Sequence, residues 1–190
     1  MKLPNAAHTE RPWRIHEIAG DFRLADVWAL DTPGGPDDFP RLVRQLAEGN
    51  DAHRSAIVRA LFAIRWKLGE LFGWDGPDAG VGSRVPTLRD RLPADLRDLP
   101  AGPDLHGVPF TSVYLTHDEW ALEAANGTVH AVLHVGWVPD EATGRYRGQM
   151  AVLVKPNGLF GTAYMAAIEP FRRLIVWPSM IRTIGRDWQK

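Results

Sequence analysis

The chain has 190 residues, of which 45% are hydrophobic and 24% charged, a composition typical of one globular domain. With 22 basic and 23 acidic side chains its net charge is -1, so no overall field attracts it to nucleic acid or anionic lipid. The absence of cysteine excludes disulfides, thiolate nucleophiles and cysteine-based zinc sites. The N-terminus has no apolar signal-peptide core, and we expect a single domain, residues 1–190, in the cytoplasm.

The first half of the chain combines one strand pattern with two helix patterns. Residues 22–31 predict a strand, and residues 39–49 predict a short helix that begins after Asp37 or Asp38 and stops at Gly49. A second helix is predicted from Asn50 or Asp51. Its apolar side chains recur every three or four residues and share one face: Ile57, Leu61, Ile64, Leu68 and Leu71.

Residues 75–109 interrupt this regular pattern. The segment contains five glycines and six prolines, which favour turns over regular elements. Long loops inside a compact domain are usually functional or mobile. We therefore expect a loop or lid, with a short helical turn near residues 90–96.

The second half predicts a meander followed by a helical segment. Four strand patterns are separated by short polar turns: 110–117, 119–125, 128–138 and 146–155. Residues 159–188 are amphipathic, and Pro170 and Pro178 are expected to kink or break the helix there. The order of elements predicts an α+β fold of the helix-grip (START-like) type. In that architecture a curved antiparallel sheet packs on a long kinked C-terminal helix and leaves a cavity.

Residues 128–138, with the sequence TVHAVLHVGWV, contain two histidines four positions apart. The β-branched residues favour a strand, in which His130 and His134 share a face but lie ~13 Å apart. Two imidazoles bound to one zinc each lie about 2.0–2.1 Å from it. We therefore expect no shared metal ion.

Alternation along the last two strands predicts one apolar and one polar face. If the strands pair as a hairpin with the apolar residues opposite one another, the polar residues gather together: His130, His134, Arg147, Gln149 and Lys155. Trp137 would then form a wall from the neighbouring face or edge. This polar face either is open to solvent or lines the polar end of a cavity. The other histidines, His8, His16, His53 and His106, are isolated and expected at the surface, and "HDE" at 117–119 is expected to be a turn or edge feature.

Several blocks of the sequence resemble a known family. The stretches TVHAVLHVGWV, YRGQMAVLVKP and YMAAIEPFRRLIVWP are similar to the bacterial family catalogued as domain of unknown function 2867, and the resemblance extends over roughly residues 14–188. It implies a helix-grip fold and no transferable activity. Members of that family occur alone or as C-terminal partners of NAD(P)-binding short-chain-reductase-like domains. Here no G-x-G-x-x-G follows a strand, so no cofactor is expected within this chain.

Three functional hypotheses remain. The first is a module that binds a small apolar or aromatic ligand in a sheet–helix cavity, through the residues His130, His134, Trp137, Arg147, Gln149 and Lys155. The second is an enzyme that uses the same polar cluster for proton transfer on a carbonyl or ring substrate, alone or with a short-chain-reductase-like partner. Neither histidine has a partner visible in the sequence, and no catalytic residue is assigned. The third, less favoured, is peripheral membrane attachment through residues 159–188.

Overall fold

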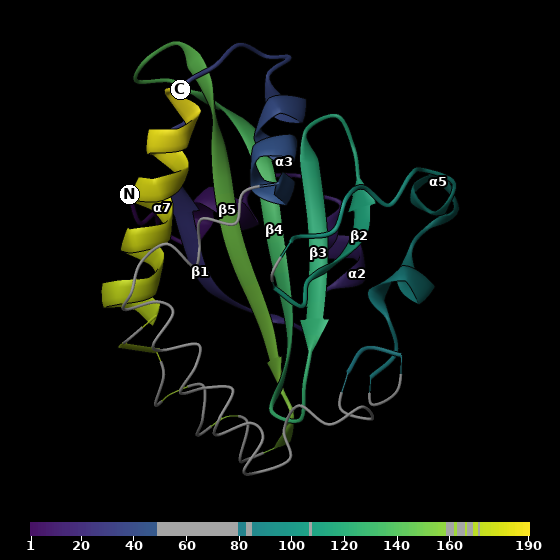
Figure 1. Ribbon diagram of the computed structural model, residues 1–190. Helices are drawn as coiled ribbons and strands as arrows, with labels where there is room; N and C mark the ends of the chain where they lie inside the picture. The colour runs from purple at the N-terminus through teal and green to yellow at the C-terminus, as the bar shows by residue number, and fades with distance from the viewer. Residues whose placement is uncertain are drawn as a thin grey trace.

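The computed structural model describes residues 1–48, 80–82, 85–106, 108–158, 162, 166, 169–170 and 172–190. The helix predicted from Asn50 or Asp51 lies outside the described residues. The described part is an α+β fold built on a curved five-stranded antiparallel sheet, with strand order β1-β5-β4-β3-β2 (Figure 1).

All five predicted strands are confirmed. The observed bounds are β1 Arg23–Ala29, β2 Thr111–Leu115, β3 Glu119–Ala125, β4 Val129–Asp140 and β5 Arg145–Pro156. Strands β2 to β5 form a meander, and β1 pairs with the outer edge of β5. The first strand of the chain therefore lies at one edge of the sheet, beside the last strand. The local sequence pattern did not indicate this position.

The register of β4 and β5 is the one that the alternation predicted. Val135 lies opposite Met150, and His134 lies opposite Ala151. Apolar residues are thus paired on one face. A slip of one residue would bring every buried side chain to the wrong face, which is why the pattern specifies the register strongly.

Two helices cover the face that carries Val135. They are α3, Phe39–Glu48, and α7, Trp177–Trp188, which Figure 1 shows on the same side of the sheet. The buried side chains Phe39 and Ile184 join Trp137 of β4 in one apolar cluster. The C-terminal helix therefore covers the sheet, as the sequence predicted.

The start of α7 shows how the chain accommodates Pro178. A π-helical turn at Arg172–Val176 precedes α7, and Pro178 lies in its first turn. Proline is tolerated there because the first turn does not need its missing N–H donor. The irregularity predicted at Pro178 is thus a change from a π-helical turn to an α-helix.

The opposite face of the sheet is covered by two short segments rather than by long helices. The first contains α1, Ala6–Thr9, and α2, Ile15–Ile18. The second contains a 3₁₀ turn η2, Leu88–Arg91, and the helix α5, Ala94–Arg97. Their buried apolar residues include Trp13, Ile15, Ile18, Leu88, Leu92 and Leu96.

The helical turn predicted near residues 90–96 is therefore present. Leu88, Leu92 and Leu96 are buried, so this part of the Gly/Pro-rich segment packs on the sheet. Strand β4 consequently lies between two protein layers, and most of its side chains are buried, whichever face of the sheet they lie on.

Candidate functional site

Two buried histidine–carboxylate pairs lie side by side on β3 and β4, on the face of the sheet opposite α3 and α7. His134 Nε2 lies 2.9 Å from Glu119 Oε2, and His130 Nε2 lies 2.8 Å from Glu123 Oε2. Only 1% of His134 and 4% of His130 is exposed. The polar face is thus not open to solvent, and other protein groups already form hydrogen bonds with its two histidines.

The Glu119 carboxylate is the centre of the larger network. Its Oε2 accepts from the Tyr114 hydroxyl at 2.9 Å as well as from His134, and its Oε1 accepts from the backbone N–H of Arg14 at 2.9 Å. A carboxylate can only accept, so His134 Nε2 carries a proton. The other ring nitrogen, Nδ1, lies 3.2 Å from Nε2 of His8. One chain of contacts therefore connects four ionisable side chains.

The Glu123 carboxylate is held in a similar way. It accepts from His130, from the backbone N–H of Leu88 and from the hydroxyl of Thr87. This pair fastens the segment at residues 87–96 to the sheet, just as Glu119 fastens the N-terminal segment. Both carboxylates thus tie a covering segment to the same face.

Burial acts against the charge on both carboxylates, and the hydrogen bonds outweigh it. Burial by itself raises the pKa of Glu119, but the bonds from His134, Arg14 N–H and Tyr114 hold the pKa below its usual value. The pKa of Glu123 is likewise raised by burial and lowered further by His130, Thr87 and the N–H of Leu88. Both groups are therefore ionised at neutral pH.

His8 is affected in the opposite sense. Burial, followed by the neighbouring charges of His134 and His16, lowers the pKa of His8 to about 3. Its Nδ1 atom is buried and has no hydrogen-bond partner within the described part of the chain. His8 is thus neutral in the folded protein, and the expectation that it lies at the surface was wrong.

The structure separates the six residues proposed as ligand contacts. Gln149 is buried on the face of His130 and His134, where its amide donates to the carbonyl of Ala7 at 3.0 Å. Trp137 lies on the opposite face and donates to the carbonyl of Gly35. The remaining two are engaged elsewhere.

Arg147 and Lys155 lie at the two ends of β5. Arg147 is half-buried, with its Nε 3.7 Å from Asp140. Lys155 is exposed and forms an ion pair with Asp21 at 2.7 Å. Lys155 is the cross-strand neighbour of His130, but the polar partners of Lys155 and Arg147 are Asp21 and Asp140 rather than the imidazoles. The buried part of the predicted polar cluster is therefore His130, His134 and Gln149.

Sequence reasoning missed Glu119, Glu123 and His8. Glu119 and Glu123 are four residues apart, like the two histidines, and the strands pair so that both sets share a face. This matching spacing across the Ala-Asn-Gly turn was the available signal. The turn expected at 117–119 is present at His117 and Asp118, whereas Glu119 is already a buried residue of β3. No signal indicated His8, because its contact with His134 spans 126 residues of chain.

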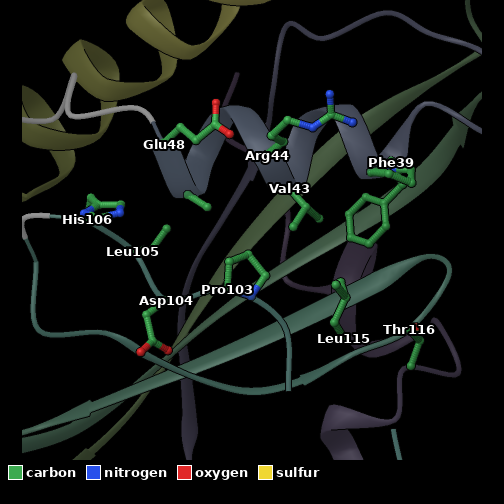
Figure 2. Close-up of a pocket in the computed structure, with 12 residues that line it drawn as sticks. Phe39, Val43, Arg44, Glu48, Pro103, Asp104, Leu105, His106, Leu115 and Thr116 are labelled. Atoms are coloured by element: carbon green, nitrogen blue, oxygen red, sulfur yellow. The ribbon is translucent and has the colours of Figure 1, made fainter. Parts of the chain in front are cut away.

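A pocket of about 540 Å³ lies on the other face, between α3 and the segment that leads into β2 (Figure 2). Its apolar wall is formed by Phe39, Pro40, Val43, Ala47, Pro103, Leu105 and Leu115, and its polar lining by Arg44, Glu48, Asp104, His106 and Thr116. None of the six residues proposed from the sequence lines it. The Gly/Pro-rich segment does contribute, through residues 103–106.

Two further classes of site are absent from the described residues. They contain no group of three or more His, Asp or Glu side chains arranged to hold a metal ion. They also contain no helix with the length and apolar character needed to cross a bilayer.

Comparison with known proteins places the chain in a family without assigning an activity. No curated protein matches it, and no solved structure matches it. One family model matches residues 18–179, which is most of the chain and includes all five strands. The chain therefore belongs to the family described as protein of unknown function (DUF2867).

Proposed function

We propose that the protein binds a small apolar or aromatic molecule in the pocket between α3 and residues 103–116. The observation that carries this proposal is the pocket itself. Its volume of about 540 Å³ falls within the roughly 300–1,000 Å³ typical of small-molecule sites. Pockets of this kind combine an apolar wall with a few polar groups that orient the ligand, and both features occur here.

The distribution of side chains supports an amphipathic ligand. Figure 2 shows the Phe39 ring and Leu115 on the inner side, whereas Arg44 and Glu48 project from α3. Arg44 and His106 are exposed basic side chains on two different elements of the rim. A ring or aliphatic body would lie against the apolar wall, and an anionic substituent would face Arg44.

The proposal includes a helix-grip arrangement of sheet and helix. It is supported by the curvature of the sheet and by Ile181, Ile184 and Trp188 of α7, which pack on the same face as Trp137. The pocket lies on this face, but α3 rather than α7 forms its wall. A cytoplasmic location is part of the same proposal and is supported by the cysteine-free composition.

The enzyme hypothesis has weaker support. His134 is oriented by Glu119, as a general base would be, but only 1% of its surface is exposed. The covering segments leave almost none of the imidazole open to a substrate. Proton transfer, alone or with a short-chain-reductase-like partner, therefore ranks below ligand binding. Membrane attachment through residues 159–188 also ranks below it, because the apolar side chains Ile181 and Ile184 of that segment pack on the sheet.

The experiment is a calorimetric titration of the protein with 1-anilinonaphthalene-8-sulfonate, an aromatic probe with one anionic group. We expect saturable binding at one site. Leu105→Glu places a charge in the apolar lining and should weaken binding by about tenfold or more, which corresponds to ~1.4 kcal/mol. The matched control is Leu99→Glu, which makes the same change at an exposed position outside the pocket.

Two results would contradict the proposal. One is the absence of saturable binding to the wild-type protein. The other is an equal affinity in the Leu105→Glu and Leu99→Glu variants when both are folded by circular dichroism. An effect of Leu105→Glu alone supports the pocket as the binding site.

A further inference from the structure

Residues 4–12, which we call the N-terminal cap, cover the Glu119–His134 pair and lie before the family-matched residues. The cap contains α1 and is held at both ends. Before it, the N–H of Leu3 donates to the carbonyl of Val27 on β1; after it, Trp13 is buried in the core. The cap can therefore move away from the sheet as a loop without detaching the core residues on either side.

One buried side chain, His8, and the carbonyls of Ala7 and His8 hold the cap; the His8 carbonyl lies 3.3 Å from Nε2 of His16 on α2. Of the nine cap residues, all of which the structure describes, His8 alone is buried. Its ring contacts His134 of β4, and the neighbouring carbonyl of Ala7 accepts from Gln149 of β5. The other cap side chains are exposed or half-buried, so little apolar area opposes release of the cap.

The surroundings of His8 favour its neutral form. The groups that face it are His16 of α2, 4.9 Å away between ring centroids, and His134 of β4, at 5.0 Å. Glu119 of β3 lies on the far side of the His134 ring, where it already accepts from Tyr114, from His134 and from a backbone N–H. Within the described chain no carboxylate contacts His8 itself, and protonation would leave a buried charge with an N–H that has no acceptor.

We propose that the N-terminal cap is a pH-sensitive cover, which protonation of His8 releases in mild acid to expose His134 and Gln149 while the sheet stays folded. Release lets the His8 cation enter water, and it leaves the Glu119–His134 pair accessible from the side that the cap had covered. The family domain would then present a buried polar site only under acidic conditions.

The sign and size of the effect follow from linkage. Burial lowers the pKa of the docked His8 to about 3, whereas a released imidazole titrates near its ordinary value of about 6.5. The released state therefore binds more protons between these values, and release becomes more favourable as the pH falls. From pH 7 to pH 5 the equilibrium constant for release should rise by about 25-fold.

The test is hydrogen exchange of the full chain followed by mass spectrometry at pH 7 and pH 5, with exchange times adjusted for the intrinsic effect of pH. Peptides from residues 4–12 should lose protection in acid, while peptides from β4 and β5 should keep theirs. His8→Gln should abolish the acid response, because glutamine can still bond to His134 but does not titrate. The matched control is His117→Gln, which removes an exposed histidine and should leave the response unchanged.

The proposal is overturned if the wild-type cap keeps its protection at pH 5, or loses it only together with β4 and β5. It is also overturned if His8→Gln responds to acid as the wild type does. His8→Gln could release the cap already at pH 7, and the wild-type imidazoles are then titrated by nuclear magnetic resonance. Protonation of His8 at the same pH as cap release supports the proposal. Cap release without protonation of His8 refutes the proposal.

Discussion

The Glu119 carboxylate offers the sharpest test of the buried network. Leucine at this position has a similar size but no acceptor, so Glu119→Leu removes the partner of three donors at once: Tyr114 Oη, His134 Nε2 and the N–H of Arg14. Glu119 is 3% exposed, and water cannot replace the lost bonds without disturbing the covering segment. The substitution should therefore destabilise the protein rather than relieve it of a buried charge.

The magnitude follows from the number of donors left without a partner. Each buried donor costs about 1–3 kcal/mol when its acceptor is removed. Leucine recovers part of this cost because a carboxylate no longer has to be desolvated. For a chain of this length, 1 kcal/mol corresponds to roughly 2–4 °C. We expect the free energy of unfolding to fall by about 3–5 kcal/mol.

The assay is urea denaturation followed by circular dichroism, with the melting temperature as a second measurement. Tyr114→Phe is the graded control, because it removes one of the three bonds and leaves the carboxylate paired. It should cost about 1 kcal/mol. A loss below about 1 kcal/mol in Glu119→Leu would refute the reasoning, since it would show that the carboxylate does not hold these donors.

Three further predictions concern packing and ionisation. Gly136→Ala should cost about 1–3 kcal/mol in a thermal melt, because its methyl group would lie 2.6 Å from the Trp13 ring; an unchanged melt would contradict the close packing. Ile184→Ala should cost about 2–5 kcal/mol, whereas Leu174→Ala, at a side chain 76% exposed, should change stability by less than about 0.5 kcal/mol; equal effects would argue against α7 as the cover of the sheet. Burial and the adjacent carboxylate raise the pKa of Tyr114. The wild type and Tyr114→Phe should therefore show the same phenolate absorbance near pH 10. A wild-type absorbance larger by that of one phenolate would contradict this prediction.

Local pattern was sufficient to predict most of the sheet. Alternating apolar residues in 128–138 and 146–155 predicted both strands and their register, because a shift by one residue would bring Val135 and Met150 to the polar face. The amphipathic pattern of the C-terminal segment likewise predicted a helix that covers the sheet, and Ile181 and Ile184 are among the side chains that do so. These features depend on side chains close in sequence, whose periodicity is visible without the fold.

The candidate site was decided by tertiary structure. His134 was identified as important, but its partners are Glu119 from a neighbouring strand and His8 from a segment 126 residues away. Nothing in the local pattern distinguishes a buried histidine from an exposed one, because burial depends on what covers the strand. The sequence determined which face of β4 carries the imidazoles. Only tertiary packing, of the N-terminal segment and residues 87–96 onto that face, determined that the imidazoles are buried and paired with carboxylates. The same packing separates them from the pocket on the opposite face.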